Sequence, residues 1–471
     1  MNPPSPLPGK LLVRGIALAV ALGIWFAPIP EGLTPKAWHL FAIFGATILS
    51  VILTAFPLLT AAMIALAAAV LTGTVAPAKA FGGFANSSVL LVVIAFLVAR
   101  GVVKSGLGRR ISYMVVRLFG RSTLGLAYSI FFTDAVIAPA FPSNTARGGV
   151  LFPIVLALSE SGGSRPEDGT ARRMGAYLMF CGIASLSVSS ALWLTATSVN
   201  PIGVEIGGTF GVGASFGKWL LAASVPALTT ILLLPLVLYK IFPPEVKETP
   251  EAPAAAREAL RTMGPMSRDE KVVAVAFALM VTGWILAGTL NLDRTAVAFA
   301  GLGALLATSV LTLDDFTREG DTLATFLWLA VLFALSGQLN EMGFMGYVGE
   351  RLAAGLGGVS WPVAYVALVV LYVLMHYLFV SQSSQVLALF GVFLEVGIRT
   401  GVPKELIAFA LLFASSYFSV ITPQGGSQNV IFVGAGYNTQ GELYKMGVFT
   451  TAFNLLVFLV VGTPWILFVT R

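Results

Sequence analysis

The chain has 471 residues, of which 57% are hydrophobic and only 11% are charged, with a formal net charge of +6. So much apolar surface with so little charge excludes an ordinary soluble fold and predicts an all-α polytopic membrane protein. Helix-length apolar runs without alternation at period two argue against an outer-membrane barrel, and the single cysteine excludes intrachain disulfides and a cysteine-based metal centre.

The first segment, 1–122, is expected to form scaffold helices. The first apolar run follows Lys10 and Arg14 and lacks a convincing cleavage site, so we expect a retained span and not a signal peptide. A stretch rich in Lys and Arg, ending at Arg121, closes the segment. The expected spans are 11–28, 38–55, 57–75 and 82–103.

A hairpin with a polar tip is predicted at the start of the next segment, 123–240, which we assign to a transport domain. The apolar stretch 124–160 is too long for one span, and it is interrupted at Pro142 and the triplet Ser143-Asn144-Thr145. Two short arms joined by a polar break predict a re-entrant hairpin, whose tip must be satisfied by surrounding protein.

A broken helix is expected after this hairpin. It begins near residue 174 and is predicted to break at 195–203, where Pro201 lacks a backbone donor and Gly203 loosens the chain. A further span at 217–240 leads to 241–271, whose prolines and mixed charges predict a cytoplasmic linker.

The second half repeats this plan, with scaffold helices over 272–357 and a second part of the transport domain over 358–471. The expected elements are spans at 272–290, 294–312 and 323–340, an amphipathic stretch at 341–357, a broken hairpin at 361–397, a helix from 404 broken at 422–429, and a last span at 446–469. The whole chain is thus predicted to have about eleven transmembrane helices and two re-entrant hairpins.

An internal duplication is indicated by three pairs of similar segments. The first pair is 96–106 and 333–343, at an offset of 237. The triplets Ser143-Asn144-Thr145 and Ser381-Gln382-Ser383 lie 238 positions apart, and 198–202 resembles 427–431 at an offset of 229. The predicted number of crossings places the two hairpins on opposite faces, which predicts inverted repeats.

The distribution of basic residues predicts the orientation in the membrane. Most of the 28 Lys and Arg fall on the cytoplasmic side if the N-terminus is cytoplasmic, as the positive-inside rule requires. Basic loops therefore explain the positive net charge, and we expect no nucleic-acid partner. The predicted location is the inner (plasma) membrane.

The four breaks supply the groups that would bind a ligand. Helix N-termini favour an anion and freed carbonyls favour a cation, which together suit a small carboxylate. No nucleophile motif, metal-binding motif or Walker loop is present, so we expect no enzyme. Polar residues that only bridge helices are the alternative. The predicted substrate contacts are Ser143, Asn144, Thr145, Arg147, Thr197, Asn200, Ser381, Gln382, Ser383, Thr422 and Gly425.

Two ionisable residues near the triplets each allow two interpretations. Arg147 is either the partner of Asp134 in the same hairpin or a fixed positive charge beside the substrate, and the two roles are compatible. His376 is either a neutral, hydrogen-bonded packing residue or a titrating substrate contact.

The stretch from Phe96 to Pro153, with Ala-Arg-Gly-Val-Val-Lys-Ser-Gly-Leu-Gly-Arg-Arg and Pro142-Ser143-Asn144-Thr145-Ala146-Arg147, resembles the divalent anion/sodium symporter family of dicarboxylate transporters. It looks most like the branch of 2-oxoglutarate/malate translocators and citrate/succinate antiporters. His376-Tyr-Leu-Phe-Val-Ser-Gln-Ser and Thr422-Pro-Gln-Gly-Gly support the resemblance, which covers nearly the whole chain.

This resemblance implies an elevator-type transporter, a homodimer, and hairpin tips that grip the two ends of a dicarboxylate. In sodium-coupled members each tip and its neighbouring helix break also bind sodium. Carried over, one ion would lie at Ser143, Asn144 and Thr195, and a second at Ser381, Gln382 and Thr422. Gln382 and Ser383 depart from the family's usual Asn and Thr.

The leading functional hypothesis is an exchanger of C4–C5 dicarboxylates (malate, succinate, fumarate or 2-oxoglutarate), in which Arg147 supplies the charge that sodium would otherwise provide. A sodium-coupled symporter is the alternative, and sulfate and citrate remain candidate substrates. An anion channel or a non-transporting receptor is a more remote alternative, because broken hairpins suit alternating access better than a continuous pore. No cofactor other than sodium is expected.

Overall fold

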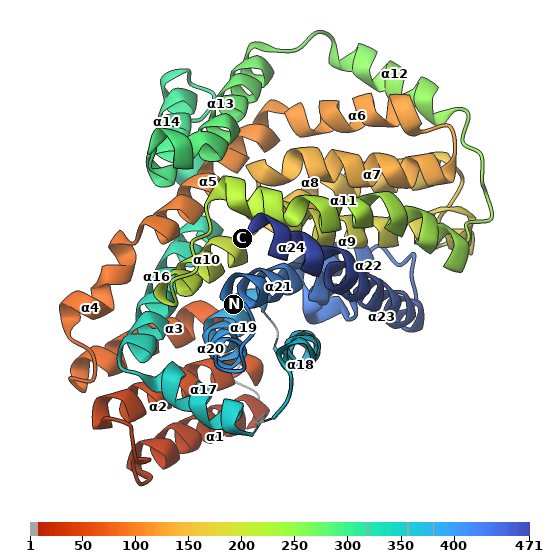
Figure 1. Ribbon diagram of the computed structural model, residues 1–471. Helices are drawn as coiled ribbons and strands as arrows, with labels where there is room; N and C mark the ends of the chain where they lie inside the picture. The colour runs from red at the N-terminus through yellow and green to blue at the C-terminus, as the bar shows by residue number, and fades with distance from the viewer. Residues whose placement is uncertain (1–7, 318–319, 356–357, 380) are drawn as a thin grey trace. The chain divides into compact units, whose positions relative to one another are not determined.

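The computed structural model describes residues 8–317, 320–355, 358–379 and 381–471, and all regular secondary structure in these ranges is helical (Figure 1). Nine helices in the described ranges are long and apolar enough to cross a membrane. Three shorter apolar helices accompany them, at Leu11–Phe26, Leu58–Leu71 and Arg294–Ala307. The chain is therefore a multi-pass helical membrane protein.

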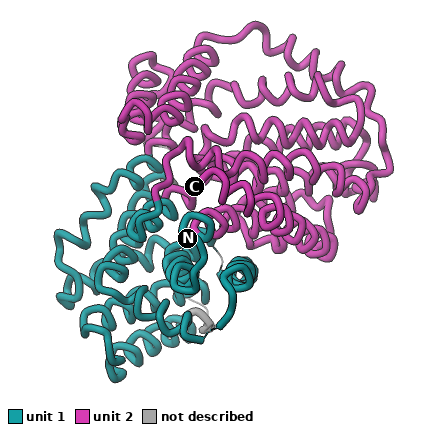
Figure 2. The backbone as a smooth tube through the Cα atoms, viewed as in Figure 1, with its two compact units in different colours: residues 1–93, 202–212, 319–407 teal, residues 94–201, 213–318, 408–471 magenta. Residues whose placement is uncertain are grey.

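The chain divides into two compact units, coloured separately in Figure 2. The first comprises residues 1–93, 202–212 and 319–407, and the second comprises 94–201, 213–318 and 408–471. The chain passes between the units at five boundaries, three of which lie within helices, in α5 (Ser87–Ser105), α10 (Val199–Thr209) and α21 (Lys404–Tyr417).

In the first unit, α2 packs against both α1 and α3, α3 packs against α16, and α20 packs against α17 and α18. Its helices are α1 (Pro8–Phe26), α2 (Pro35–Ile52), α3 (Leu58–Leu71), α4 (Pro77–Phe81), α16 (Gly320–Glu341), α17 (Phe344–Ala354), α18 (Trp361–Met375), α19 (Gln382–Gln385) and α20 (Gly391–Arg399). The predicted amphipathic stretch 341–357 corresponds to α17, and its last two residues lie outside the described ranges.

The second unit is built around α9 (Gly175–Leu192), every residue of which is buried. The helices α7, α8, α11 and α22 pack around α9. Helix α12, which lies in the predicted linker, packs against α6. The other helices of this unit are α6 (Leu107–Phe119), α7 (Thr123–Ile137), α8 (Asn144–Ser161), α11 (Phe216–Ile241), α12 (Ala252–Met263), α13 (Arg268–Leu290), α14 (Arg294–Ala307), α15 (Leu313–Thr317), α22 (Ser427–Val433), α23 (Gln440–Val457) and α24 (Thr463–Val469).

Capping residues define where several helices begin. Thr34 accepts a hydrogen bond from the Ala37 amide, with Pro35 in the first turn of α2, where its missing N–H is not needed. Ser267 and Glu270 form a capping box at the start of α13. These short-range patterns can be found in the sequence without knowledge of the fold.

The two predicted hairpins repeat the same local structure at the offset of 238. A single 3-10 turn ends the first arm in each, at Ala138–Ala140 and at His376–Leu378. Ser143 then caps α8 by accepting from the Ala146 amide at 3.2 Å, and Ser381 caps α19 by accepting from the Ser384 amide at 3.4 Å. The duplication inferred from the triplets is therefore reproduced in backbone geometry.

Both helix breaks begin and end earlier than predicted, and these boundaries were wrong. Residue Leu192 is the last of α9 and Val199 the first of α10, so the first break is 193–198 and Pro201 lies in the first turn of α10. The second break runs from Phe418 to Gly426, before α22. Pro201 did not extend the break because a proline in the first helical turn removes no needed donor.

Candidate functional site

The tip of the first hairpin is the centre of the candidate site in the second unit. Residues Phe141 to Ser143 form an extended connection between the two arms, and Ser143 caps α8. The break 193–198 holds this tip from one side, since the Ser198 amide donates to Pro142 O at 2.9 Å and Thr195 Oγ1 donates to Pro139 O at 2.9 Å. The α8 N-terminus, with its partial positive charge, is thus fixed at the tip.

Arg147 lies in the first turn of α8 and is completely buried, as is Asp134 on α7. Its Nε is 3.2 Å from Asp134 Oδ1, which forms the ion pair that was one of the two predicted arrangements. Ser189 on α9 donates a hydrogen bond to the other carboxylate oxygen. The guanidinium charge is therefore neutralised inside the protein.

The remaining donors of Arg147 bind oxygen atoms from three different segments. Nη1 donates to Ala196 O at 3.2 Å, and Nη2 is within 2.7–3.1 Å of Asn144 Oδ1, Leu186 O and Ser190 Oγ. The side chain thereby ties the tip to α9 and to the first break. Charge-assisted hydrogen bonds of this kind are the strong ones, so they hold the tip rigidly.

Asn144 is the residue of the first triplet with an unused polar group. Its Oδ1 accepts from Arg147 Nη2 at 2.8 Å and from Ser190 Oγ at 2.7 Å, which fixes the orientation of the amide. Its Nδ2 is buried and has no hydrogen-bond partner among the described residues. A buried donor without a partner is costly, and here it lies in the first turn of α8, where an anion is favoured.

The second helix break contacts the same tip. The hydroxyls of Thr145 and Ser427 form a hydrogen bond, and α8 packs against α22. Thr422 and Gly425, the substrate contacts predicted in this break, precede Ser427 by a few residues. Thr422 is half-buried and Gly425 is buried. The structure therefore brings the first tip and both helix breaks together within the second unit.

Asn200 and Asn429 have equivalent structural contacts in the two repeats. Asn200 Nδ2 donates to Ser190 O at 2.7 Å and to Trp193 O at 3.0 Å. Asn429 Nδ2 donates to Ser419 O at 2.7 Å and to Thr422 O at 2.9 Å. In each case the side-chain amide belongs to the helix that follows the break. It donates to carbonyls in the last turn of the preceding helix or in the break itself. These contacts explain how the breaks are stable when buried.

We expect Asn200→Ala and Asn429→Ala to lower stability by similar amounts, roughly 1–3 kcal/mol for buried carbonyls left without a donor. Thermal unfolding of the detergent-purified variants measures this loss. Thr289→Ala is the matched control, because Thr289 also donates to a carbonyl, Leu286 O, but is exposed. A parent-like melting temperature for Asn200→Ala together with lost transport would instead assign Asn200 to the substrate.

The second triplet lies in the first unit. Ser381 and Gln382 are half-buried, and Ser383 is buried. Four positions beyond the cap of α19 lies Gln385, which takes the place that Arg147 has in the first repeat and is likewise fully buried. The second tip therefore has a neutral residue where the first has a charged one.

Gln385 and His376 hold the second tip by side-chain hydrogen bonds. Gln385 Nε2 donates to Tyr372 O at 2.8 Å, and its Oε1 is 2.8 Å from His376 Nδ1. Because Oε1 can only accept, the proton of this bond belongs to Nδ1. His376 is fully buried, in agreement with the packing interpretation of this residue.

Two sodium positions were predicted, and each can be compared with the contacts of its residues. At the first, Asn144 Oδ1 and the carbonyl of Ala196 in the adjoining break already accept from Arg147. A sodium ion that shared these oxygens would lie close to the guanidinium charge, which would repel it. The first position, at Ser143, Asn144 and Thr195, stays a prediction. The residues of the second position belong to different units, since Ser381 and Gln382 lie in the first and Thr422 in the second. That position stays a prediction.

Several residues that shape the site were not found from the sequence. Ser189 and Ser190 on α9 bind Asp134, Asn144 and Arg147. Their signal is the polar run from Ser185 to Ser190 in an otherwise apolar helix, which requires partners for its hydroxyls. Gln428, buried next to Ser427, was also missed.

Thr197 is buried in the first break, where its hydroxyl accepts weakly from the Val199 amide at 3.5 Å. With such a long hydrogen bond, the hydroxyl retains most of its capacity to bind another group. Thr197 and the Asn144 amide thus both have hydrogen-bonding capacity to spare.

Comparisons with known proteins agree with these observations. The family model of the sodium:sulfate symporter transmembrane region matches residues 9–470. A Bacillus subtilis (strain 168) protein named "Putative malate transporter YflS" is 42% identical over 458 residues, which are 97% of this chain and 96% of that protein. The spinach (Spinacia oleracea) protein "Dicarboxylate transporter 1, chloroplastic" is 39% identical over 94% of this chain and 78% of its own length.

Among solved structures, the MtrF protein of Neisseria gonorrhoeae, described as illuminating a class of antimetabolite efflux pumps, superposes with a TM-score of 0.60. The match covers 98% of this chain and 95% of that one, at 16% sequence identity. This similarity concerns the fold.

Proposed function

This chain belongs to the family of the sodium:sulfate symporter transmembrane region, and from that premise we propose that it exchanges C4–C5 dicarboxylates across the plasma membrane. It is a transporter and not an enzyme, as the family and the names of its relatives indicate. Relatives named for malate and for dicarboxylates, each alignable over most of the chain, support this substrate class.

The observation that carries the proposal is the unpartnered Asn144 amide in the first turn of α8. A carboxylate placed there would accept from Asn144 Nδ2 and would lie at a helix N-terminus, where a negative charge is stabilised. The hydroxyls of Ser143, Thr145 and Thr197 would supply further hydrogen bonds. The predicted contacts of the second triplet, Ser381, Gln382 and Ser383, belong to the first unit and stay a prediction.

The sequence predicted that Arg147 supplies the positive charge that sodium would otherwise provide. Because Asp134 pairs with Arg147, the proposal gives the guanidinium another role, which is to position the Asn144 amide. Asp134 neutralises its charge, so the guanidinium orients Asn144 without adding net charge to the empty site. An empty carrier that crosses the membrane takes the unsatisfied Asn144 donor with it, whereas a bound carboxylate satisfies that donor. Movement of the loaded form is therefore favoured, which is the property of an exchanger.

The finer features of the proposal follow the family resemblance. They are inverted repeats with re-entrant hairpins, about eleven transmembrane helices, elevator-type movement, a homodimer, and a cytoplasmic N-terminus. A sodium-coupled symporter on the same site is the alternative that the next experiment separates from exchange.

Proteoliposomes preloaded with malate, succinate or 2-oxoglutarate are expected to take up labelled dicarboxylate at least tenfold faster than empty ones, with little dependence on sodium. Scintillation counting of filtered vesicles measures the uptake, and vesicles without protein are the control. Strong uptake into empty vesicles under a sodium gradient would replace exchange by symport. A planar-bilayer current that corresponds to many more ions per second than a carrier can transport would indicate a channel.

A further inference from the structure

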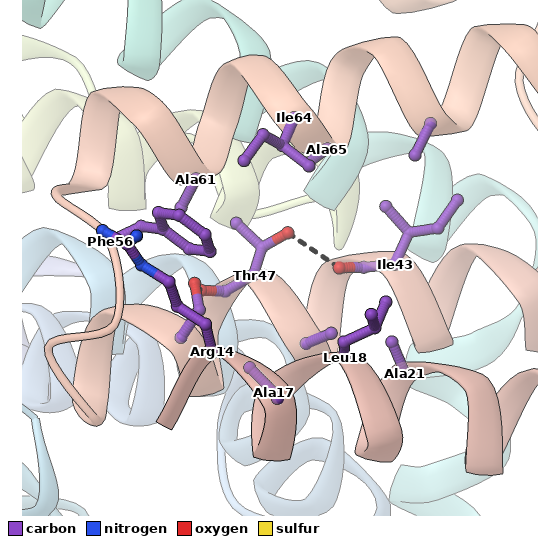
Figure 3. A pocket seen from close by; sticks show the side chains of 14 residues that line it. Arg14, Ala17, Leu18, Ala21, Ile43, Thr47, Phe56, Ala61, Ile64 and Ala65 are labelled. Atoms are coloured by element: carbon purple, nitrogen blue, oxygen red, sulfur yellow. Dashed lines mark hydrogen bonds between the residues drawn. The ribbon is translucent and has the colours of Figure 1, made fainter. Parts of the chain in front are cut away.

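A cavity of about 430 Å³ lies in the first unit between α1, α2 and α3, and its lining includes none of the candidate site residues (Figure 3). Its walls are mainly Ala, Leu, Ile and Phe side chains from the three helices. Arg14 and Phe56 lie at one end of the cavity, and Ala21 and Ile43 lie toward the other. Between Arg14 and Ala21 the helix rises by roughly 10 Å, so the cavity is elongated along α1.

The two hydroxyl groups of the cavity wall are already satisfied. Thr47 Oγ1 donates to Ile43 O at 2.7 Å, and Ser50 Oγ donates to Thr47 O at 2.8 Å. A buried water needs two to four polar partners, and these hydroxyls are turned toward their own helix. The cavity is thus suited to an apolar guest and not to ordered water.

Arg14 places a positive charge at the end of this apolar cavity. Its Nε donates to Ala55 O at 3.1 Å, and the guanidinium carbon lies 4.7 Å from the centre of the Phe56 ring. These contacts fix the plane of the guanidinium, while Nη1 and Nη2 have no hydrogen-bond partner in the described part of the chain. Such a fork matches the two oxygens of a phosphate.

The position of Arg14 along α1 agrees with the depth of lipid headgroups. It lies in the second turn of a helix that begins at Pro8 and continues with apolar residues to Phe26. Leu11 and Leu18, on either side of Arg14, are 58% and 61% exposed, so this part of α1 presents apolar side chains to its surroundings. A charge near the end of an apolar membrane helix is expected at the headgroup level.

We propose that the cavity between α1, α2 and α3 binds one acyl chain of an anionic phospholipid, whose phosphate is held by the Arg14 guanidinium. The bilayer supplies acyl chains to any apolar cavity, so the chain itself gives little selectivity. The bidentate contact with Arg14 gives preference for a headgroup with net negative charge over a zwitterionic one. This site is separate from the proposed dicarboxylate site and does not depend on the transport mechanism.

Native mass spectrometry of the detergent-purified protein tests this proposal, with phosphatidylglycerol and phosphatidylcholine added separately at equal concentrations. The parent is expected to retain one phosphatidylglycerol per chain with roughly tenfold preference, as expected for a charge-assisted bidentate contact. Arg14→Gln should reduce the preference to about one, and Arg14→Lys should retain part of it. Lys36→Gln, which removes a charge from an exposed residue of α2 outside the cavity, should behave as the parent.

A cavity-filling variant provides a second test of the proposal. Ala21 and Ala68 line the cavity without being fully buried, so Ala21→Leu with Ala68→Leu should remove the lipid adduct although Arg14 is intact. The proposal is wrong if the parent retains both lipids equally or if Arg14→Gln keeps the preference. It is also wrong if the filled variant changes the oligomeric mass but not the lipid count, because the cavity then contacts a second copy of the chain.

Discussion

Replacement of Arg147 by alanine is expected to lower the stability of the protein by about 3–5 kcal/mol and to abolish dicarboxylate exchange. The variant leaves Asp134, which is 0% exposed, without its partner, and an unpaired buried charge accounts for a loss of this size. It also removes the donors to Ala196 O, Leu186 O and Asn144 Oδ1. Thermal unfolding in detergent and exchange in proteoliposomes measure the two effects.

A double variant separates the ion pair from the other contacts of Arg147. Arg147→Ala with Asp134→Asn removes both charges and should recover much of the stability, but exchange should remain lost because Asn144 is no longer oriented. Arg147→Lys should fold and keep part of the exchange, since an ammonium group can pair with Asp134 but cannot make the same set of hydrogen bonds. If the double variant transports at the parent rate, Arg147 serves only to neutralise Asp134.

The second repeat offers a matched control for this experiment. Gln385 occupies the position equivalent to Arg147, is equally buried, and binds Tyr372 O and His376. Gln385→Ala should lower stability by only about 1–3 kcal/mol, because Gln385 forms hydrogen bonds but no ion pair. Equal losses for Gln385→Ala and Arg147→Ala would show that unpaired charge is not the cause of the larger effect.

Asn144→Asp is expected to reduce exchange by at least two orders of magnitude while the protein remains folded. The substituted carboxylate still offers an oxygen to Arg147 and Ser190, so the internal contacts of the tip are kept. It lacks the Nδ2 donor proposed for the substrate, and its negative charge repels an approaching dicarboxylate. The measurement is the initial exchange rate at several substrate concentrations, together with the melting temperature.

Asn144→Ala and Ser190→Ala serve as comparisons for this variant. Asn144→Ala removes both the donor and the acceptor, so it should lose exchange and some stability. Ser190→Ala removes one internal contact to Asn144 Oδ1 and leaves Nδ2 in place, so most of the exchange should remain. Parent-like exchange by Asn144→Asp would contradict the proposed contact between Nδ2 and the substrate.

The boundaries of the helix breaks illustrate the limit of local patterns. Pro201 and Gly203 predicted a break at 195–203, but the helix ends at Leu192 and begins again at Val199. The cause is Asn200, whose amide reaches back to the carbonyls of Ser190 and Trp193 and so allows an earlier end. A contact that crosses a break is not visible in the propensities of the residues on either side.

The sequence by itself determined the membrane class and indicated the duplication and the two polar tips, because these depend on composition and on residues a few positions apart. Ser143 and Ser381 begin helices for local reasons that any reader of the sequence can find. The partner of Arg147 was open between Asp134 and the substrate until the packing of α7, α8 and α9 was known. Only the tertiary structure showed the Asp134 ion pair and the other contacts of Arg147, because Asp134, Leu186, Ser190 and Ala196 reach the guanidinium from segments 13 to 49 positions away in the chain.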